Sequence, residues 1–202
     1  MASYRTIASP SEAVFTDRRS RFLAFAHPVR TADEARQLVK QYSKEYYDAR
    51  HVCFAYMLGA ARTEFLANDN GEPSGTAGRP ILGQINSAEV TDIIILVVRY
   101  FGGIKLGTPG LIAAYKEAAR LVLENADIVK RHEMARLTVT FPYMAMNDVM
   151  KAVKDSEIEI VDRQFDNTCH LTVETRLTLA DALRGRLLGI DGVTEHQPGE
   201  ES

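Results

Sequence analysis

Apolar positions in the first 130 residues predict several β-strands. Residues 21–29 (RFLAFAHPV) alternate between large apolar and small or polar side chains, which is the period of a strand. Residues 51–59 and 63–69 are two further runs joined by a short Gly-Ala-Ala-Arg link, and we expect them to form a hairpin. Residues 92–98 (DIIILVV) are apolar without alternation, as in a strand that is covered on both faces.

Three helices are predicted between and after these strands. Thr31 fits the capping-box pattern with Glu34, and apolar residues then recur on one helical face. The segment PILGQIN (80–86) predicts a short helix. Thr108 is a suitable N-cap and Pro109 is preset for the first helical position, so we expect a helix of about four turns to begin there.

The pattern restarts beyond residue 130 and gives the order strand, helix, strand, strand, helix, strand. A turn is predicted at Asp166-Asn167, Thr178 is a candidate helix cap, and Gly192-Val193 begins a last short strand. The apolar residues that carry these elements are Leu137, Val139, Phe141, Met146, Val149, Met150, Val153, Ile158, Ile160, Leu171, Val173, Leu183, Leu187 and Leu188. This βαββαβ order is that of the ferredoxin-like fold.

The elements and the composition together predict an α+β protein of two domains, residues 1–130 and 131–202. The chain has 202 residues, of which 46% are hydrophobic and 25% charged, as in an ordinary globular protein. The first 130 residues carry 16 Lys and Arg against 14 Asp and Glu, and the remainder carries 8 against 13. Neither part is a basic domain, so the net charge gives no support to binding of nucleic acid.

The cysteines and the apolar segments favour a cytoplasmic protein. Cys53 and Cys169 each lie in an apolar alternating run, which predicts buried thiols in a reducing compartment and no disulfide. No stretch approaches the ~20 apolar residues that a membrane helix needs, and the first residues contain no apolar core of a signal peptide. We therefore expect no contact with a membrane.

The stretch RYFGGIKLGTPGL (99–111) has the composition of an anion cradle. It joins a buried strand to a helix start, where glycines allow close approach and unpaired N–H groups face outward. Arg99 and Lys105 supply positive charge, and a small anion is a possible ligand of residues 102–108. The stretch is not a Walker loop, because Thr108-Pro109 follow Gly107 where Lys and Ser or Thr are required. A tight connection without any ligand is an equally good interpretation of the composition.

The stretch DNGEPSGTAGRP (69–80) has the opposite charge. Asp69 and Glu72 could act as a general base, with hydroxyl groups from Ser74 and Thr76 nearby. Thr76 could also cap a following helix. No further carboxylate or histidine stands at ligand spacing, so we expect neither a metal nor a cofactor. A rigid structured turn is the simpler interpretation, and catalysis is only a weak candidate role for Asp69, Glu72 and Ser74.

His51 and Cys53 share one face of a predicted strand. Such neighbours stand ~7 Å apart, which is beyond hydrogen-bond reach, so they do not predict a nucleophilic pair. A core histidine with its own partners beside a buried thiol is the expectation.

Taken together, DNGEPSGTAGRPIL (69–82) and VVRYFGGIKLGTPGLIAAY (97–115) resemble the paired signature of the IMPACT family, called YigZ-like in bacteria. The upstream strand HVCFAY also fits, and the resemblance covers nearly the whole chain. Val98 stands where many family members have Thr, Pro109 stands where Gly is usual, and Ala113 stands where a basic residue is frequent. The missing basic residue weakens any expectation that this helix end holds a polyanion.

The resemblance implies a fold and a function. The N-terminal domain would have the fold of the second domain of small-subunit ribosomal protein five, and the C-terminal domain would be ferredoxin-like, similar to late domains of elongation factor G. Eukaryotic members restrain the amino-acid-starvation kinase by competing for its activator protein, and they carry an extra N-terminal domain. This chain begins almost directly with the family domain, so the resemblance does not carry that partner over to it.

The leading hypothesis is a non-enzymatic regulator of translation or stress response that acts through a protein or ribosome-associated partner. A first alternative is a phosphate- or nucleotide-binding enzyme that uses the glycine-rich loop with Glu72 or Asp69. A second is an RNA-binding protein. For the regulator and for the enzyme, the two loops would form one cleft, whose candidate residues are Asp69, Glu72, Ser74, Thr76, Arg79, Arg99, Tyr100, Gly102, Gly103, Lys105, Gly107 and Thr108.

Overall fold

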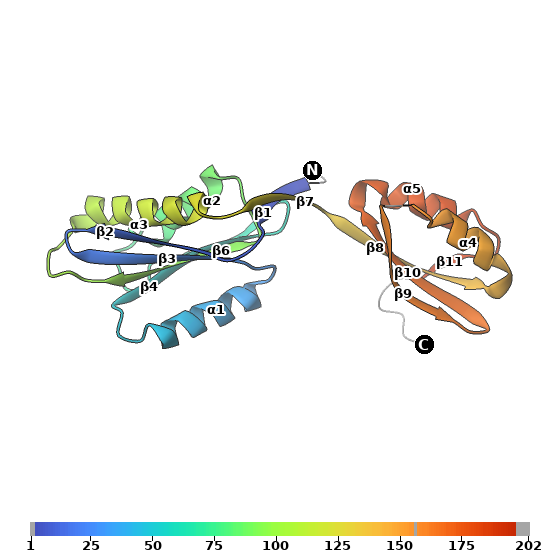
Figure 1. The fold of residues 1–202 in the computed structure, drawn as a ribbon, viewed down its shortest axis with the longest axis horizontal. Helices are drawn as coiled ribbons and strands as arrows, with labels where there is room; N and C mark the ends of the chain where they lie inside the picture. The colour runs from blue at the N-terminus through green and yellow to red at the C-terminus, as the bar shows by residue number, and fades with distance from the viewer. Residues whose placement is uncertain (1–2, 156, 197–202) are drawn as a thin grey trace. The chain divides into compact units, whose positions relative to one another are not determined.

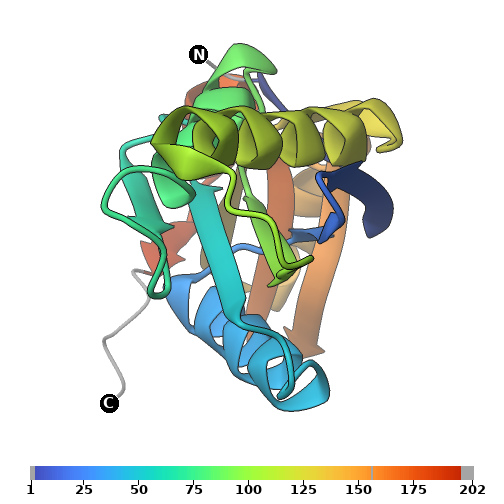
Figure 2. The same ribbon diagram turned by 90° about the vertical axis from the view of Figure 1, so that its left-hand side faces the viewer.

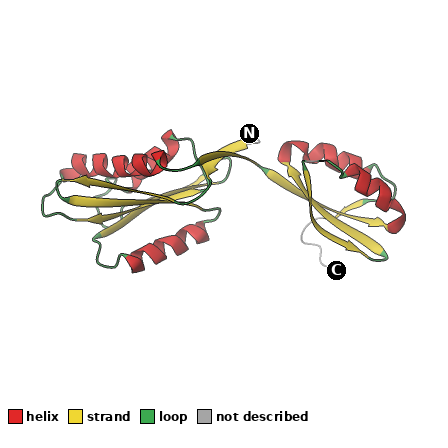
Figure 3. Cartoon of the chain, in the orientation of Figure 1, coloured by secondary structure: helices red, strands yellow, loops and turns green. Residues whose placement is uncertain are grey.

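The computed structural model describes residues 3–155 and 157–196 of the chain. These residues form two compact units, which divide between Arg131 and His132. Each unit combines helices with a mainly antiparallel sheet (Figures 1 and 3). The predicted α+β class with two domains is therefore confirmed.

Within the described residues, the N-terminal unit contains seven strands and three helices. Its strands are β1 (Ser3–Ile7), β2 (Ser11–Asp17), β3 (Ser20–Pro28), β4 (His51–Leu58), β5 (Glu64–Asn68), β6 (Ile93–Tyr100) and β7 (Ile128–His132), which ends at the division. Its helices are α1 (Ala32–Glu45), α2 (Gly78–Ser87) and α3 (Gly107–Glu124). The predicted strands, the β4–β5 hairpin and the three helices are confirmed, whereas β1, β2 and β7 were not predicted.

Five strands of this unit form an antiparallel sheet in the order β2-β3-β6-β4-β5, and β1 pairs with β7. Helices α2 and α3 cover one face of the five-stranded sheet, and α1 covers the other (Figure 1). The residues of β6 from Ile93 to Val98 are all fully buried, because this central strand contributes side chains to both cores. That is the structural reason for its unbroken apolar run.

The C-terminal unit has the element order predicted from its periodicity. The elements are β8 (Met134–Pro142), a short 3-10 turn at Tyr143–Ala145, α4 (Met146–Ala152), β9 (Ile158–Phe165), β10 (Thr168–Arg176), α5 (Leu177–Leu188) and β11 (Thr194–His196). The sheet order β11-β8-β10-β9 is that of a ferredoxin-like fold. Apolar residues from α4, α5 and one face of the sheet form a single core.

One predicted helix cap is confirmed and three are wrong. Thr31 caps α1, since its hydroxyl accepts from the N–H of Glu34 over 3.2 Å. Helix α3 begins one residue before Thr108, at Gly107, whose φ of 73° suits glycine, and no side chain caps it. Helix α5 begins at Leu177, so Thr178 lies inside its first turn and no side chain caps it; the Leu177 N–H, which has no partner within the helix, donates to the Glu133 carbonyl. Thr76 does not cap α2, whose N-cap position is occupied by an alanine.

No helix within the described residues is both long and apolar enough to cross a membrane.

Candidate functional site

The two glycine-rich loops lie at the same end of the five-stranded sheet, the end that faces the viewer in Figure 2. One loop joins β5 to α2 and the other joins β6 to α3. A cavity of about 540 Å³ opens between them. Its walls are formed by Arg50, His51, Gly71, Glu72, Pro73, Arg99, Phe101, Lys105, Leu106, Gly107, Thr108 and Leu111. The residues from the two signature stretches thus meet in space although about 25 positions separate them along the chain.

An ion pair between Glu72 and Arg99 lies in the buried wall of the cavity. The Arg99 guanidinium donates to Glu72 Oε1 over 2.6 Å, and the Tyr115 hydroxyl donates to the same oxygen over 2.8 Å. Glu72 is 8% exposed and Arg99 is 6% exposed. Charges this deeply buried are tolerated only when paired, so each side chain offsets the cost of burying the other. Burial, helped by nearby Cys53 and Glu72, raises the pKa of Tyr115 far above its usual range, so its hydroxyl remains a donor.

Strand pairing explains how Arg99 reaches this position. In β6 it lies opposite Phe22 of β3 and His51 of β4, on the sheet face that α3 covers. Its guanidinium carbon stands 5.7 Å from the centre of the Phe22 ring and 5.8 Å from that of Phe101. These distances suit cation–π contacts. Its Nε has no hydrogen-bond partner among the described residues.

His51 and Cys53 have separate partners, and neither forms a nucleophile–base pair with the other. Nδ1 of His51 lies 2.8 Å from the carbonyl oxygen of Asn70, and its Nε2 lies 3.8 Å from Glu72 Oε2, too far for a hydrogen bond. The Cys53 thiol donates to the Asp69 carbonyl over 2.9 Å. Burial raises the pKa of Cys53 to about 12, so the thiolate is essentially absent at neutral pH.

Asp69 organises the first loop instead of facing the cavity. Its carboxylate accepts from the backbone N–H groups of Gly75, Ala77 and Gly78, over 2.8, 3.0 and 2.8 Å. It therefore satisfies the N-terminus of α2 from nine residues upstream. Burial alone would raise the pKa of Asp69, but these three donors outweigh it and hold the pKa below its usual value. Thr76 is fully buried, and its hydroxyl donates to the Pro73 carbonyl over 2.6 Å.

The second loop is partly structural and partly open to the cavity. The N–H of Gly102 donates to the Ser20 hydroxyl over 3.3 Å, and a Cβ on Gly102 would lie 2.1 Å from the backbone carbon of Arg19. This glycine therefore permits contact with the β2–β3 turn and does not point an N–H at the cavity. Lys105, Gly107 and Thr108 do line the cavity, beside the first turn of α3.

Several residues proposed from the sequence lie outside the cavity lining. Tyr100 follows Arg99 in β6 and points to the opposite sheet face, where its hydroxyl donates to Asp48 over 2.8 Å. Ser74 is exposed on the loop before α2, and Arg79 is exposed in the first turn of that helix. The proposed residues that do not line the cavity are Asp69, Ser74, Thr76, Arg79, Tyr100, Gly102 and Gly103.

Seven residues of the cavity lining were not proposed from the sequence, namely Arg50, His51, Gly71, Pro73, Phe101, Leu106 and Leu111, and neither was Tyr115 behind the wall. Arg50 and His51 stand at the start of β4 and reach the cavity because β4 pairs with β6. Phe101 and Tyr115 lie within the second signature stretch, but neither was proposed as a residue of the site. The position of Tyr115 in a helix stripe could have signalled a buried hydroxyl that needs a partner. The pairing of β4 with β6 has no local signal in the sequence.

The open side of the cavity carries positive charge. Arg50 and Lys105 are exposed, and neither forms an ion pair within residues 3–155 and 157–196. The N-terminus of α3 adds partial positive charge. Because Glu72 is already neutralised by Arg99, the rim favours anionic groups. No cluster of three or more His, Cys, Asp and Glu side chains in the described part of the chain could hold a metal ion.

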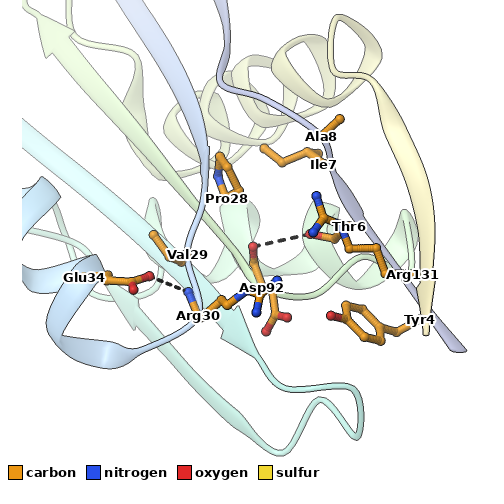
Figure 4. A pocket seen from close by; sticks show the side chains of 10 residues that line it. All are labelled: Tyr4, Thr6, Ile7, Ala8, Pro28, Val29, Arg30, Glu34, Asp92 and Arg131. Atoms are coloured by element: carbon orange, nitrogen blue, oxygen red, sulfur yellow. Dashed lines mark hydrogen bonds between the residues drawn. The ribbon is translucent and has the colours of Figure 1, made fainter. Parts of the chain in front are cut away.

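A second, smaller pocket of about 300 Å³ lies beside Asp92, which directly precedes β6, whereas the larger cavity lies where β6 ends. Figure 4 shows the residues that line the smaller pocket. Arg30, Arg131, Tyr4 and Asp92 surround it together with apolar residues of β1 and β3. Its lining combines two cations with two carboxylates, those of Asp92 and Glu34. None of the residues proposed from the sequence lines it, so the larger cavity remains the candidate site.

Comparison with known proteins links the site to one family. The model of the Impact N-terminal domain matches residues 18–123. The IMPACT family member YvyE of Bacillus subtilis is 34% identical over 155 residues, which cover 77% of this chain and 71% of that protein. The IMPACT family member YigZ of Escherichia coli is 30% identical over 197 residues, which cover 93% and 97%.

One solved structure matches along the full length of both chains. It is the crystal structure of a hypothetical protein, with a TM-score of 0.76 and 27% sequence identity. The two-unit fold is therefore shared with a protein of low sequence similarity.

Proposed function

The chain belongs to the IMPACT family, and we propose that it is a non-enzymatic regulator of translation or of a stress response. It acts through contacts with a protein or with the ribosome, and the cavity between the two signature loops is the contact site. Every residue of the cavity wall lies within the part of the chain that matches the family domain.

The composition of the cavity wall supports this role. Pro73, Phe101, Leu106 and Leu111 present apolar surface, and Phe101 is 44% exposed. Exposed cations at the rim stand next to this surface. An aromatic anchor in a pocket with a charged rim is the arrangement that many recognition sites use.

The carboxylates of the first loop are engaged in structural contacts. Glu72 accepts from both Arg99 and Tyr115, so a proton taken up by its carboxylate would break a buried ion pair. Asp69 is held by three backbone donors and does not line the cavity. These contacts disfavour general-base chemistry by either residue and favour a binding role.

A binding assay with paired variants tests the proposal. We expect the double variant Arg50→Glu with Lys105→Glu to lose capture of a partner from cell extract and co-sedimentation with ribosomes, because both side chains are exposed at the rim. The matched control is Lys40→Glu with Lys116→Glu, which reverses two exposed charges outside the cavity. If neither capture nor co-sedimentation is observed for the wild type, or if both variants behave alike, the cavity is not the contact site.

The positive charge at the cavity rim also favours a second candidate function, that of a phosphate- or nucleotide-binding enzyme. The rim cations and the N-terminus of α3 would also suit a phosphate or nucleotide, the ligand of an enzyme. We expect such a ligand, at 100 times its Kd, to stabilise the protein by about 2.7 kcal/mol in a thermal-shift assay. A panel of nucleotides and phosphorylated metabolites without any shift would count against the enzyme.

A further inference from the structure

The end of the sheet that contains the cavity is locally basic. We define the basic end as residues 17–21, 48–51 and 99–108 together with Glu72. It carries six Arg and Lys (Arg18, Arg19, Arg21, Arg50, Arg99 and Lys105) against three Asp and Glu (Asp17, Asp48 and Glu72), a net charge of +3. The whole chain has a net charge of −3. The basic end is therefore positively charged although the net charge of the whole chain is negative.

Five of these cations are available to a partner. Arg18, Arg19, Arg21, Arg50 and Lys105 are exposed. None of them forms an ion pair within the described ranges. Only Arg99 is buried and neutralised, by Glu72. The exposed charges thus remain unsatisfied by the protein itself.

Backbone contacts hold these cations in a row across the sheet. Arg18 and Arg19 form the tight turn between β2 and β3, with φ of 44° and 66°. Arg21 of β3 lies opposite Tyr100 of β6, and the N–H of Arg50, just before β4, donates to the Arg99 carbonyl over 3.2 Å. The row therefore runs along this end of the sheet from the β2–β3 turn to the start of β4, with no exposed cation on β6. Arg21 lies on the same sheet face as Tyr100, away from the cavity, whereas Arg50 lines the cavity.

The length of this row suits a nucleic-acid strand. Neighbouring strands of a sheet lie about 4.8 Å apart, so the row extends over about 14 Å. A nucleic-acid backbone is a continuous polyanion, so cations spread over this distance can contact more than one phosphate of the same strand. Four of the five exposed cations are arginines, whose planar guanidinium binds phosphate in a bidentate manner. Phe101 stands within the same row, 44% exposed, where a base could stack on its ring.

We propose that the basic end binds the backbone of single-stranded RNA and that Phe101 stacks on one of its bases. The inference rests on the proposed function, because it names the chemistry of the contact with a ribosome. An acidic protein segment would also be attracted to the cations, but it would not need the spaced arginines or an exposed ring.

The test measures binding of a fluorescent twelve-nucleotide poly(U) RNA at several salt concentrations. The variant is Arg18→Asn with Arg19→Gly and Arg21→Ser. Asn-Gly is the preferred sequence for a two-residue turn with two positive φ angles, so this variant keeps the fold while removing three charges. We expect its affinity at low salt to fall roughly tenfold or more. The slope of log affinity against log salt should shrink by about 0.7 for each phosphate that the variant no longer neutralises.

The control removes the same number of exposed charges elsewhere, with Lys40→Ser, Lys116→Ser and Lys154→Ser. Equal losses in the two triple variants would mean that only net charge matters, and the proposal would be overturned.

Phe101→Ala should weaken RNA binding about tenfold without changing the salt slope. Failure of the wild type to bind RNA, or equal binding of a poly-glutamate peptide through the same arginines, would also overturn it. If RNA binding fails while partner capture still depends on Arg50 and Lys105, the proposed function stands and this inference falls.

Discussion

Buried Arg99 and exposed Lys105 illustrate how two cations of one short stretch can have different roles. Arg99 donates to Glu72 inside the cavity wall, whereas Lys105 is exposed at the rim. The sequence alone treats both as candidate anion ligands, because burial depends on which strands pair with β6. Only Lys105 can be removed to test binding without disturbing the fold.

Removal of Arg99 should destabilise the protein strongly. Arg99→Ala would leave the Glu72 carboxylate buried without its cation, and we expect the free energy of unfolding to fall by about 3–5 kcal/mol. The double variant Arg99→Met with Glu72→Gln should recover most of this loss, since an uncharged pair of similar volume has no unpaired charge. Urea denaturation of both proteins measures the difference. A single variant that loses less than about 1 kcal/mol would show that the ion pair is not buried in solution.

Asp69 should make the stability depend on acidic pH. Its pKa in the folded protein is lowered by the donors at Gly75, Ala77 and Gly78, which outweigh the effect of burial. The ionised carboxylate therefore stabilises the fold above the pKa of the unfolded chain, about 3.9, and this stabilisation is lost as the pH falls through the folded pKa.

Comparison with Asp69→Asn isolates this contribution. We expect the variant to be less stable than the wild type near pH 6 by about 1–3 kcal/mol, because it loses charge-assisted hydrogen bonds. The difference should narrow as the pH is lowered from 5 to 3. Urea midpoints measured at half-unit steps give the two curves, and parallel curves would argue against an ionised cap.

At the scale of the elements, Gly102 ties the β6–α3 loop to the β2–β3 turn. An added Cβ would stand 2.1 Å from the backbone carbon and 2.2 Å from the backbone oxygen of Arg19. Since backbone atoms cannot simply rotate away, we expect Gly102→Ala to cost about 1–3 kcal/mol and to separate the two segments.

Gly83 in α2 provides the matched control for Gly102. Nothing lies within 4 Å of its added Cβ, and it is within a helix, so Gly83→Ala should stabilise the protein by about 0.5–1 kcal/mol. Thermal unfolding of the two variants should therefore shift in opposite directions. A Gly102→Ala variant that unfolds at the wild-type temperature or above it would show that the contact at Gly102 is not restrictive.

Local sequence rules predicted the elements better than their ends. Periodicity identified β6 and α3 because burial on two faces or on one stripe leaves a direct trace in residue type. The predicted cap at Thr76 failed because a cap can come from elsewhere: Asp69 satisfies the start of α2 from nine residues away. The cap at Thr108 failed because α3 begins one residue earlier, at Gly107, without any side-chain cap. A side chain that folds back over a loop leaves no trace in the residues next to the helix.

The site could be predicted only in part for a similar reason. The two loops were identified by their glycines and charges, and both contribute to the cavity. Tyr115 stands among the buried apolar residues of α3, where residue type alone predicts only packing, although its hydroxyl donates to Glu72 from 43 residues away. Arg18 and Arg19 were not considered, because their position beside the second loop follows from strand pairing across the sheet.

At the scale of the whole molecule, each unit contains a core of its own. Leu183 of α5 is 1% exposed among apolar residues of the C-terminal unit, and Ile81 of α2 is fully buried within the N-terminal unit. Because a truncated core residue weakens packing only in the cluster around it, we expect Leu183→Ala and Ile81→Ala each to cost about 2–5 kcal/mol within one unit.

Hydrogen exchange read by mass spectrometry would follow the two units separately. Leu183→Ala should lower amide protection in residues 132–196 and leave residues 3–131 unchanged, and Ile81→Ala should do the reverse. Equal loss of protection in both units from either substitution would show that they unfold as one cooperative body, and the binding variants at the basic end would then need a stability check across the whole chain.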